Sequence, residues 1–337
     1  MALRFLRLPG MDTGSWAGRA VGETCRADAG GGRAFESGAS WGGEGRMERA
    51  GWQAFTCAAP STPAMLHRRI FPRANADVPD AAAGWVVFVH GAGGSSAIWH
   101  RQIRAFQAHH NVLMVDLRGH GGSQLDEAVA ERLTYSFDAV AREVLAVLDE
   151  EGVAAAHFVA ISLGTIVIRQ LGEIAPERVL SLTMGGAVVR LNLRSRFLVG
   201  FGSLVRRFVP FIWLYRLLAW IIMPRRRHRT SRMLFVNEAK RVAQREFLRW
   251  WKLTAQVNPL LRLFRERDVA IPTLYVMGAE DHLFLPTARR VAREHASAEL
   301  AVVDDSGHVV NIDQPDAFNR LVLAFLDRVR PVPALAA

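Results

Sequence analysis

The sequence predicts an α/β protein with a mostly parallel central sheet flanked by helices. Short apolar runs of strand length recur between Trp85 and Val303, and helix-length stretches separate them. This alternation is typical of βαβ units, in which a crossover helix returns the chain to the next parallel strand. A composition with 50% hydrophobic and 22% charged residues is that of a globular protein, and it excludes collagen-like and wholly disordered chains.

Six strands and four helices follow from these patterns. Each predicted strand is a short continuous apolar run, the form expected when both faces of a strand are buried. The predicted strands are Trp85–His90, Val112–Asp116, Ala156–Ile161, Val179–Met184, Ile271–Met277 and Leu300–Val303. The predicted helices are Ala97–His109, Phe137–Glu150, Thr165–Glu173 and Phe318–Val329.

The alternation is interrupted once, between the fourth and fifth predicted strands. Residues 187–267 contain helical patterns without a strand. We interpret this stretch as a helical cap, basic and apolar, inserted after the fourth predicted strand, Val179–Met184. Residues 64–186 and 268–330 are then predicted to form one α/β core, because a single large domain with an insertion suits a chain of 337 residues.

Residues 1–63 differ in composition from the rest of the chain. Twelve of the 28 glycines fall within residues 10–51, and no apolar period is sustained there. We expect this stretch to be disordered or a non-native extension, with the working protein beginning near Met47 or Met65. The first eight residues lack the apolar core and cleavage site of a secretory signal, so the expected location is cytoplasmic.

A nucleophile elbow is predicted at the end of the third strand. The segment Ala160-Ile-Ser-Leu-Gly164 joins that strand to a helix opened by Thr165. A serine on so sharp a turn has a strained backbone, and the residues two before and two after it must be small to avoid collision. Ala160 and Gly164 meet this requirement, which makes Ser162 the candidate nucleophile.

A glycine-rich loop follows the first predicted strand. His90-Gly-Ala-Gly-Gly94 places backbone N–H groups at the carboxyl edge of the sheet, where an oxyanion needs donors. An ordinary glycine turn or a phosphate loop is the alternative, but no nucleotide-binding glycine pattern accompanies it. We predict that the N–H groups of Ala92 and Leu163 form an oxyanion hole and that His90 holds the loop in shape.

A base and an acid are needed to activate the serine, and an α/β fold of this kind presents them in the chain order Ser, acid, His. Asp281 follows the fifth strand and His308 follows the sixth, so both are placed at the carboxyl edge of the sheet. Glu280 is the rival acid. Asp304 and Asp305 are expected to be too near His308 in sequence to reach its far nitrogen.

Together these motifs resemble those of the α/β-hydrolase-fold serine hydrolases. The resemblance covers Trp85–Val329 and is carried by His90–Gly94 with Trp99, Asp116–Ser123, the Ser162 elbow, Gly278-x-x-Asp281 with Pro286, and Gly307-His308 followed by Asp313-Gln-Pro315. It implies Ser162 as nucleophile, His308 as general base and acid, and Asp281 as the orienting acid, with no metal or organic cofactor. It also implies that Asp116–Ser123 is a structural turn. Ala160 stands where Gly is usual and Ile161 where His is frequent, which weakens assignment to a subfamily.

The expected activity is hydrolysis of a carboxylic ester or thioester with a sizeable apolar acyl group. Acyl transfer and carbon–carbon bond hydrolysis use the same residues and stay open as alternatives. Ser rather than Asp at the elbow disfavours haloalkane dehalogenases and epoxide hydrolases. The alternative outside enzymology is a catalytically silent lipid-binding or ligand-binding module on the same fold.

Positive charge is concentrated in the predicted cap. Residues 190–267 hold 19 basic and three acidic residues, a net charge of +16, so the remainder carries −6 of the total of +10. No helix-turn-helix, zinc-finger or RNP pattern accompanies this charge, and we expect no nucleic-acid partner. Cys25 and Cys57 are too few for a disulfide framework and are not at zinc-ligand spacing.

The predicted cap is also the most apolar part of the chain. Residues 197–223 are rich in Phe, Leu, Ile and Trp, but arginines interrupt them and Pro210 and Pro224 limit any helix, so we reject a transmembrane span. We expect this stretch to line an acyl or aryl pocket. Arg225–Arg229 and a basic series at positions 241, 245, 249 and 252 predict either a solvated face or recognition of an anionic partner. That partner would be a membrane surface, coenzyme A or an acyl-carrier protein.

Overall fold

The computed structural model describes residues 66–74, 84–191, 200, 204, 209–255 and 257–329. The predicted N-terminal extension, its two cysteines and the start sites suggested at Met47 and Met65 lie outside these residues. Among the helices of the described ranges, none is both long enough and apolar enough to cross a membrane.

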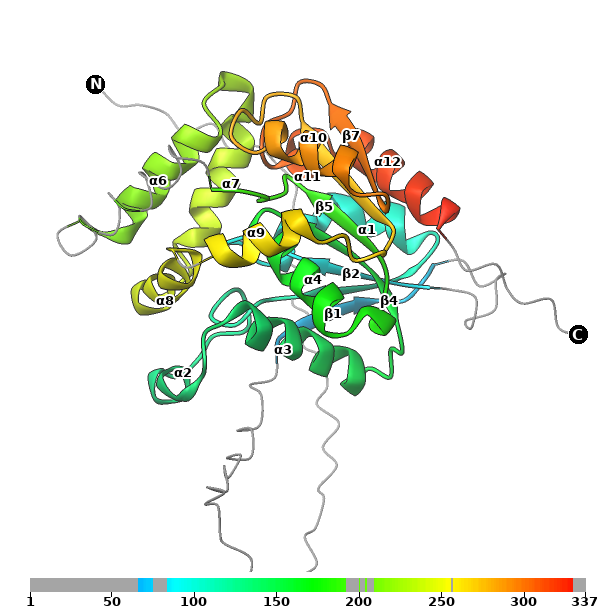
Figure 1. The fold of residues 1–337 in the computed structure, drawn as a ribbon. Helices are drawn as coiled ribbons and strands as arrows, with labels where there is room; N and C mark the ends of the chain where they lie inside the picture. Colours follow the sequence, from blue (N-terminus) through cyan, green and yellow to red (C-terminus); the bar gives the residue numbers. More distant parts are fainter. Residues whose placement is uncertain are drawn as a thin grey trace, which may run out of the picture. The chain divides into compact units, whose positions relative to one another are not determined.

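Seven strands form one sheet in the order β1-β3-β2-β4-β5-β6-β7 (Figure 1). All neighbouring pairs are parallel except β1 with β3, so the predicted mostly parallel sheet is confirmed. The strands are β1 (Arg68–Phe71), β2 (Trp85–Val89), β3 (Asn111–Val115), β4 (Ala156–Ile161), β5 (Val179–Gly185), β6 (Thr273–Gly278) and β7 (Ala298–Val303). Strand β1 was not predicted, because this half-exposed edge strand has no continuous apolar run.

Two pairs of helices cover opposite faces of the sheet (Figure 1): α1 packs with α12, and α3 packs with α4. The core elements are η2 (Ser96–Trp99), α1 (His100–Gln107), α2 (Glu127–Arg132), α3 (Phe137–Glu150), α4 (Leu163–Ile174), η3 (Pro176–Arg178), α10 (Leu285–Glu294), α11 (Val310–Asp313) and α12 (Pro315–Arg328). Helix α3 has the predicted bounds. The predicted first helix begins as a 3-10 turn, because the Ser95 hydroxyl accepts a bond from Ala97 N and starts the turn early.

The centre of the sheet is buried on both faces. Every residue of β4 is buried, as expected for a parallel strand covered by helices on each side. On the α1 face, the ring of Phe88 lies 4.9 Å from that of Trp99 and 5.0 Å from that of Phe106. This rigid centre supports the loops at the carboxyl ends of β2, β4, β6 and β7, where the candidate residues lie.

The regular secondary structure that the structure describes between β5 and β6 is all helical. We call residues 209–255 and 257–267 the α6–α9 segment; it contains α6 (Phe211–Ile222), η4 (Arg226–His228), α7 (Arg229–Ala239), α8 (Gln244–Ala255) and α9 (Asn258–Glu266). Helix α6 begins directly after Pro210 and ends two residues before Pro224, within the limits that the prolines predict. Helices α6 and α7 pack against each other (Figure 1).

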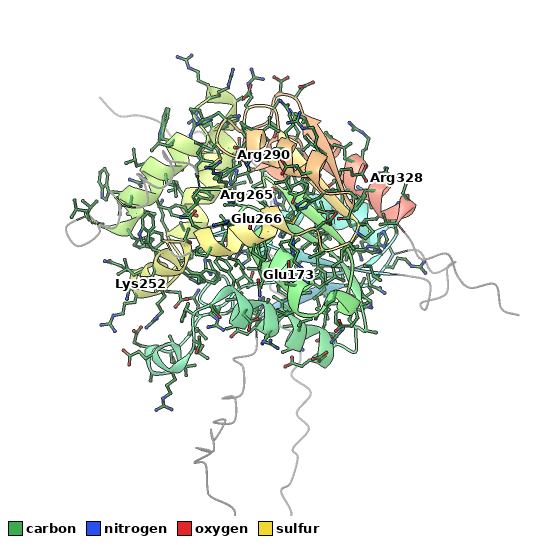
Figure 2. All side chains as sticks on the ribbon, viewed as in Figure 1. Glu173, Lys252, Arg265, Glu266, Arg290 and Arg328 are labelled. Atoms are coloured by element: carbon green, nitrogen blue, oxygen red, sulfur yellow. The ribbon has the colours of Figure 1, made fainter. Side chains whose placement is uncertain are left out.

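Ion pairs and backbone bonds attach α9 to the core. Arg169 of α4 donates to the carbonyl oxygen of Arg267 at 2.7 Å, and Arg267 pairs with Glu173 at 3.0 Å. Arg265 donates to the carbonyl oxygen of Val189 at 2.9 Å. Figure 2 labels Arg265 on α9 and Glu173 on α4 on the same side of the molecule. These bonds hold the end of the α6–α9 segment on the sheet domain.

The predicted basic series is confirmed as one helix face for residues 245, 249 and 252, which lie on α8, but not for Arg241. Arg241 follows α7 and pairs with Glu238, because the helix breaks before α8 begins at Gln244. On α8, Arg249 pairs with Glu127 and with Glu246 at 3.2 Å. These arginines are neutralised largely by acids of this chain, which leaves less charge for a partner.

Candidate active site

Ser162 occupies the turn between β4 and α4. Its φ of 55° and ψ of −124° are strained for a residue with a side chain, as the elbow requires. Helix α4 begins at Leu163, two residues before the predicted start at Thr165, because the elbow leads straight into the first helical turn. A Cβ on Gly164 would lie 2.6 Å from the carbonyl oxygen of Val89, so no larger residue fits there.

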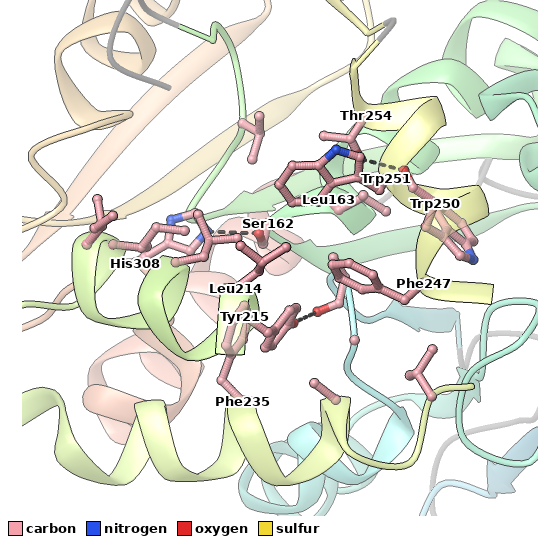
Figure 3. Close-up of a pocket in the computed structure, with 18 of the residues that line it drawn as sticks. Ser162, Leu163, Leu214, Tyr215, Phe235, Phe247, Trp250, Trp251, Thr254 and His308 are labelled. Atoms are coloured by element: carbon pink, nitrogen blue, oxygen red, sulfur yellow. Dashed lines mark hydrogen bonds between the residues drawn. The ribbon is translucent and has the colours of Figure 1, made fainter. Parts of the chain in front are cut away.

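Three loops bring Ser162, His308 and Asp281 into one line of hydrogen bonds. His308 Nε2 lies 2.8 Å from Ser162 Oγ (Figure 3). On the other side of the ring, His308 Nδ1 lies 2.8 Å from Asp281 Oδ2. His308 and Asp281 are each 1% exposed. The ring of Phe284 covers the imidazole at 5.1 Å between centroids. The carboxylate requires Nδ1 to carry a hydrogen, which leaves Nε2 free to accept a proton from the serine.

Close backbone packing sets the position of His308. Gly186, directly after β5, has a φ of +48°, and a Cβ there would collide with the His308 carbonyl oxygen. The Ser162 N–H donates to the carbonyl oxygen of Gly185 at 3.0 Å. Gly185 therefore contacts the serine and Gly186 contacts the histidine. No local pattern in the sequence indicates this role.

Glu280, the rival acid, faces away from His308. Its carboxylate lies 2.9 Å from His228 Nε2 and 3.3 Å from Arg225 Nε, both at the start of α7 or just before it. Arg227 pairs with Asp305 and lies 3.6 Å from Glu280. Arg225 and Arg227, for which the sequence predicts a solvated face or an anionic partner, therefore have acidic partners within the chain.

The glycine loop after β2 is held by two buried histidines. His90 Nδ1 donates to the carbonyl oxygen of Gly91 at 2.7 Å, and His90 Nε2 accepts from Leu117 N at 2.9 Å. His120 Nδ1 donates to the carbonyl oxygen of Arg118, and its Nε2 accepts from Gly93 N at 3.0 Å. Burial lowers the pKa of His90 and lowers the pKa of His120 to about 3, so both rings are neutral acceptors at neutral pH.

Ala92 and Leu163, the predicted oxyanion donors, line the same cavity as Ser162 and His308. The loop passes close to the serine, since a Cβ on Gly91 would lie 3.0 Å from the Ser162 Cβ. Leu163 is the first residue of α4, where backbone N–H groups have no partner inside the helix. From α6, the Tyr215 hydroxyl donates to the Ala92 carbonyl oxygen (Figure 3). Sequence analysis missed Tyr215, because nothing near it in the chain indicates this contact.

The turn after β3 makes structural hydrogen bonds. Asp116 accepts hydrogen bonds from Ser96 N at 2.6 Å and from Gly122 N at 2.8 Å. Burial raises the pKa of this carboxyl, but the hydrogen bonds outweigh burial, so the pKa is lowered overall. The Ser123 hydroxyl donates to the Asp116 carbonyl oxygen at 2.6 Å. Asp116 therefore closes its own turn onto the start of η2, away from the Ser162 hydroxyl.

The cavity beside Ser162 measures about 160 Å³ and is apolar. The sheet domain contributes Ile166, Val188 and Phe284, and the α6–α9 segment contributes Leu214, Leu218, Phe235, Phe247 and Trp251 among others (Figure 3). The rings of Tyr215 and Phe235 stack at 4.3 Å. No Lys, Arg, Asp or Glu is among the described residues that line it. Nor do three or more His, Cys, Asp or Glu of the described ranges form a group that could hold a metal ion.

Comparison with known proteins bears on both the fold and the chemistry. The model of the alpha/beta hydrolase family matches residues 86–321. A protein of Azorhizobium caulinodans with the provisional name carbamate hydrolase RutD is 30% identical over 254 residues, covering 71% of this chain and 89% of that protein. The 3-oxoadipate enol-lactonase 1 of Acinetobacter baylyi is 23% identical over 259 residues, covering 73% and 89%.

Solved structures share the fold at lower identity. The enol-lactonase from Burkholderia xenovorans matches with a TM-score of 0.62 and 21% identity, covering 78% of this chain and 96% of that one. An esterase from Thermogutta terrifontis matches with a TM-score of 0.64 and 18% identity, covering 79% and 94%.

Proposed function

This chain belongs to the alpha/beta hydrolase family, and on that premise we propose that it is a serine hydrolase that cleaves a carboxylic ester or thioester with a sizeable apolar acyl group. The observation that carries the proposal is the hydrogen-bonded line Ser162–His308–Asp281 at the wall of an uncharged, apolar cavity. The line supplies a nucleophile and its base, and the cavity supplies room for an acyl chain.

The reaction begins with attack of Ser162 Oγ on the carbonyl carbon of the substrate. His308 Nε2, 2.8 Å away, takes the hydroxyl proton as the new C–O bond forms. Asp281 holds the imidazole in the required tautomer and stabilises its positive charge. The tetrahedral intermediate then collapses, and His308 returns the proton to the departing alcohol or thiol. A water molecule then attacks the acyl-enzyme carbonyl while His308 takes its proton. His308 returns that proton to Ser162 Oγ as the C–O bond breaks and the carboxylic acid leaves.

Developing charge on the carbonyl oxygen is stabilised by the N–H groups of Ala92 and Leu163. Loss of one such donor typically costs a factor of about 10² to 10³ in kcat. The position of Leu163 at the start of α4 adds the positive end of the helix dipole. Tyr215 holds the Ala92 carbonyl, and His120 holds the next N–H, so the loop is fixed before substrate arrives.

The lining of the cavity supports an uncharged apolar acyl group. Each buried methylene contributes about 0.8 kcal/mol to binding, whereas a carboxylate would lose its hydration without gaining a cation among the described lining residues. A charged leaving group, such as coenzyme A or a carrier protein, would therefore lie outside the cavity. The relatives named for a carbamate and an enol-lactone also act at a carbonyl carbon bonded to a heteroatom.

A fluorophosphonate probe tests the proposal directly. We expect one labelled site at Ser162, abolished in Ser162→Ala, and hydrolysis of p-nitrophenyl esters that improves as the acyl chain grows beyond acetate. Acyl-coenzyme A thioesters in the same panel separate thioesterase from esterase activity, and added alcohol acceptors detect acyl transfer. A folded protein that neither reacts with the probe nor turns over any ester would contradict the proposal and favour a ligand-binding module.

A further inference from the structure

Helix α6 has two apolar faces. Leu214 and Leu218 point to the catalytic cavity and line it. Trp213, Leu217 and Trp220 follow the i, i+4, i+7 spacing of the other, outward face and are 61%, 48% and 60% exposed, with Leu217 at its border with the cavity. Two solvated indoles and a leucine on a single helix face are costly to leave in water, so this face suggests a partner.

Cations that have no carboxylate partner among the described residues surround the outer face of α6. A hollow of about 310 Å³ between α6 and α7 is lined by Trp220 and Met233 together with four basic residues, Arg216, Arg229, Arg232 and Lys240. No acidic residue is among its described lining, and none of the four cations has a carboxylate within 4 Å in the described part of the chain. The Arg232 guanidinium lies 4.6 Å from the Trp220 ring centroid, and that of Arg216 lies 5.6 Å from the Trp213 ring centroid.

This arrangement contrasts with the arginines nearby. Arg225 and Arg227 are engaged by Glu280 and Asp305. Around the hollow, Arg232 donates to the carbonyl oxygens of Met223 and Arg225, and Lys240 donates to Asn237 Oδ1, but no carboxylate of the described residues neutralises any of the four cations. Helices α6 and α7 lie together at the left of Figure 1, away from α12. Indole, aliphatic and cationic side chains are therefore combined on one side of the molecule.

We propose that this α6–α7 face, formed by Trp213, Trp220, Met233 and the four cations, docks on the surface of an anionic phospholipid bilayer. Tryptophan rings are stable at the boundary between headgroups and acyl chains, where one edge is apolar and the other is wet. Arginine and lysine at that depth meet lipid phosphates, and each adds roughly a fivefold gain in affinity for an anionic surface. Since α6 has only 12 residues, it lies along the interface and does not span it.

A bilayer fits the face better than a nucleic acid or a soluble anion does. Met233 and Leu217 are exposed aliphatic side chains that cannot stack on nucleic-acid bases, whereas they can be buried among lipid acyl chains. Leu217 also lines the catalytic cavity, so the mouth of the cavity adjoins the docking face. On the basis of the proposed function, an ester held in the bilayer would then reach Ser162 alongside α6 without crossing bulk water.

Vesicle co-sedimentation of the full chain tests the docking surface. We expect binding to vesicles of phosphatidylcholine with 30% phosphatidylglycerol at about 0.05 M NaCl, weaker binding to pure phosphatidylcholine, and release at about 0.5 M NaCl as screening shortens the reach of the charges. Trp213→Ser with Trp220→Ser should weaken binding at least about tenfold, and so should Arg216→Gln with Arg229→Gln and Lys240→Gln.

Matched controls distinguish binding through this face from nonspecific adsorption to vesicles. Val129→Ser with Leu263→Ser removes exposed apolar groups elsewhere, and Arg101→Gln with Arg104→Gln and Arg289→Gln removes the same charge from other helices. Both control sets should bind vesicles like the wild type. Thermal melts verify that every variant is folded. Failure of the wild type to bind at low salt, or equal losses in the docking and control sets, would overturn the proposal.

Two further measurements distinguish this proposal from the proposed function. Ser162→Ala should bind vesicles as the wild type does, and the Trp213/Trp220 double variant should hydrolyse a short soluble ester at the wild-type rate. Binding to duplex DNA that is lost in the arginine set, without any vesicle binding, would assign the face to nucleic acid and overturn the lipid assignment.

Discussion

The Tyr215 hydroxyl on α6 donates a hydrogen bond to the carbonyl oxygen of Ala92, on the loop after β2. The two residues are 123 positions apart, and the bond ties the α6–α9 segment to the loop that carries a proposed oxyanion donor. Positioning of the proposed oxyanion hole therefore involves a residue outside the sheet domain.

Replacement of Tyr215 by Phe should slow turnover with little change in KM. The ring remains stacked on Phe235, but the Ala92 loop loses a bond worth about 0.5 to 1.5 kcal/mol, so we expect kcat to fall roughly threefold to tenfold. Steady-state kinetics on a short ester measure the effect. Tyr135→Phe is the control, because its hydroxyl bonds to Glu246 away from the cavity, and it should leave kcat unchanged.

Removal of the nucleophile or the base should cost about the same as removal of both. Ser162→Ala and His308→Ala should each lower kcat on the order of 10⁴-fold to 10⁶-fold, and the double variant should be little worse, because the two groups act as a unit. Additive losses in the three rate measurements would show that the 2.8 Å contact between them is not the catalytic one.

Asp281 and Glu280 should differ sharply although they are neighbours. Asp281→Asn should lower kcat about 10⁴-fold by favouring the wrong imidazole tautomer. Glu280→Gln should keep kcat within about threefold and instead lower the melting temperature, since it removes the anion that faces Arg225 and His228. A crippled Glu280→Gln enzyme beside an active Asp281→Asn enzyme would reverse the assignment.

Stability should rise with pH between about 3 and 6.5 and then level off. His120 has a folded pKa of about 3, while its ordinary value is 6.5, so the unfolded chain binds a proton in this range that the folded chain excludes. The slope contributed by this one group is about 1.4 kcal/mol per pH unit. Its contribution is fully present above pH 6.5 and is lost as the pH falls toward 3.

Urea unfolding at pH values from about 4.5 to 7.5 measures this slope. His120→Gln should be less stable at pH 7, because the Gly93 N–H loses the ring nitrogen that accepts its hydrogen bond. The stability of this variant should vary less with pH than that of the wild type. His100→Gln, at an exposed position on α1, should retain the slope of the wild type. An unchanged slope in His120→Gln would place the titration elsewhere.

Local patterns were enough to predict most of the sheet. Strands such as β4 are continuous apolar runs because both of their faces are buried, and this property can be read without knowing the neighbours. Strand β1 escaped prediction because it is a short edge strand whose pairing with β3 depends on contacts 40 and more residues away. Helix α10 has an apolar stripe of Leu285, Ala288 and Val291 that could have revealed it.

The candidate site was predictable as far as strand ends define it. Ser162, Asp281 and His308 each follow a strand of a parallel sheet, and the carboxyl ends of such strands meet at one edge. Tyr215 and His120 were not predictable in their roles, because their partners are fixed by packing between elements that no local period specifies.

The sequence by itself determined the fold, the order of the three candidate residues and the concentration of charge in residues 190–267. Tertiary structure alone placed Asp281 against His308 and the adjacent Glu280 against His228, although both occupy the same predicted loop. It also decided that Arg225 and Arg227 meet carboxylates of this chain, whereas Arg216, Arg229 and Lys240 meet none among the described residues. The physical reason is that hydrogen bonds and ion pairs act over a few ångströms and in set directions, so they depend on how separate elements pack, whereas apolar periodicity is a property of each element alone.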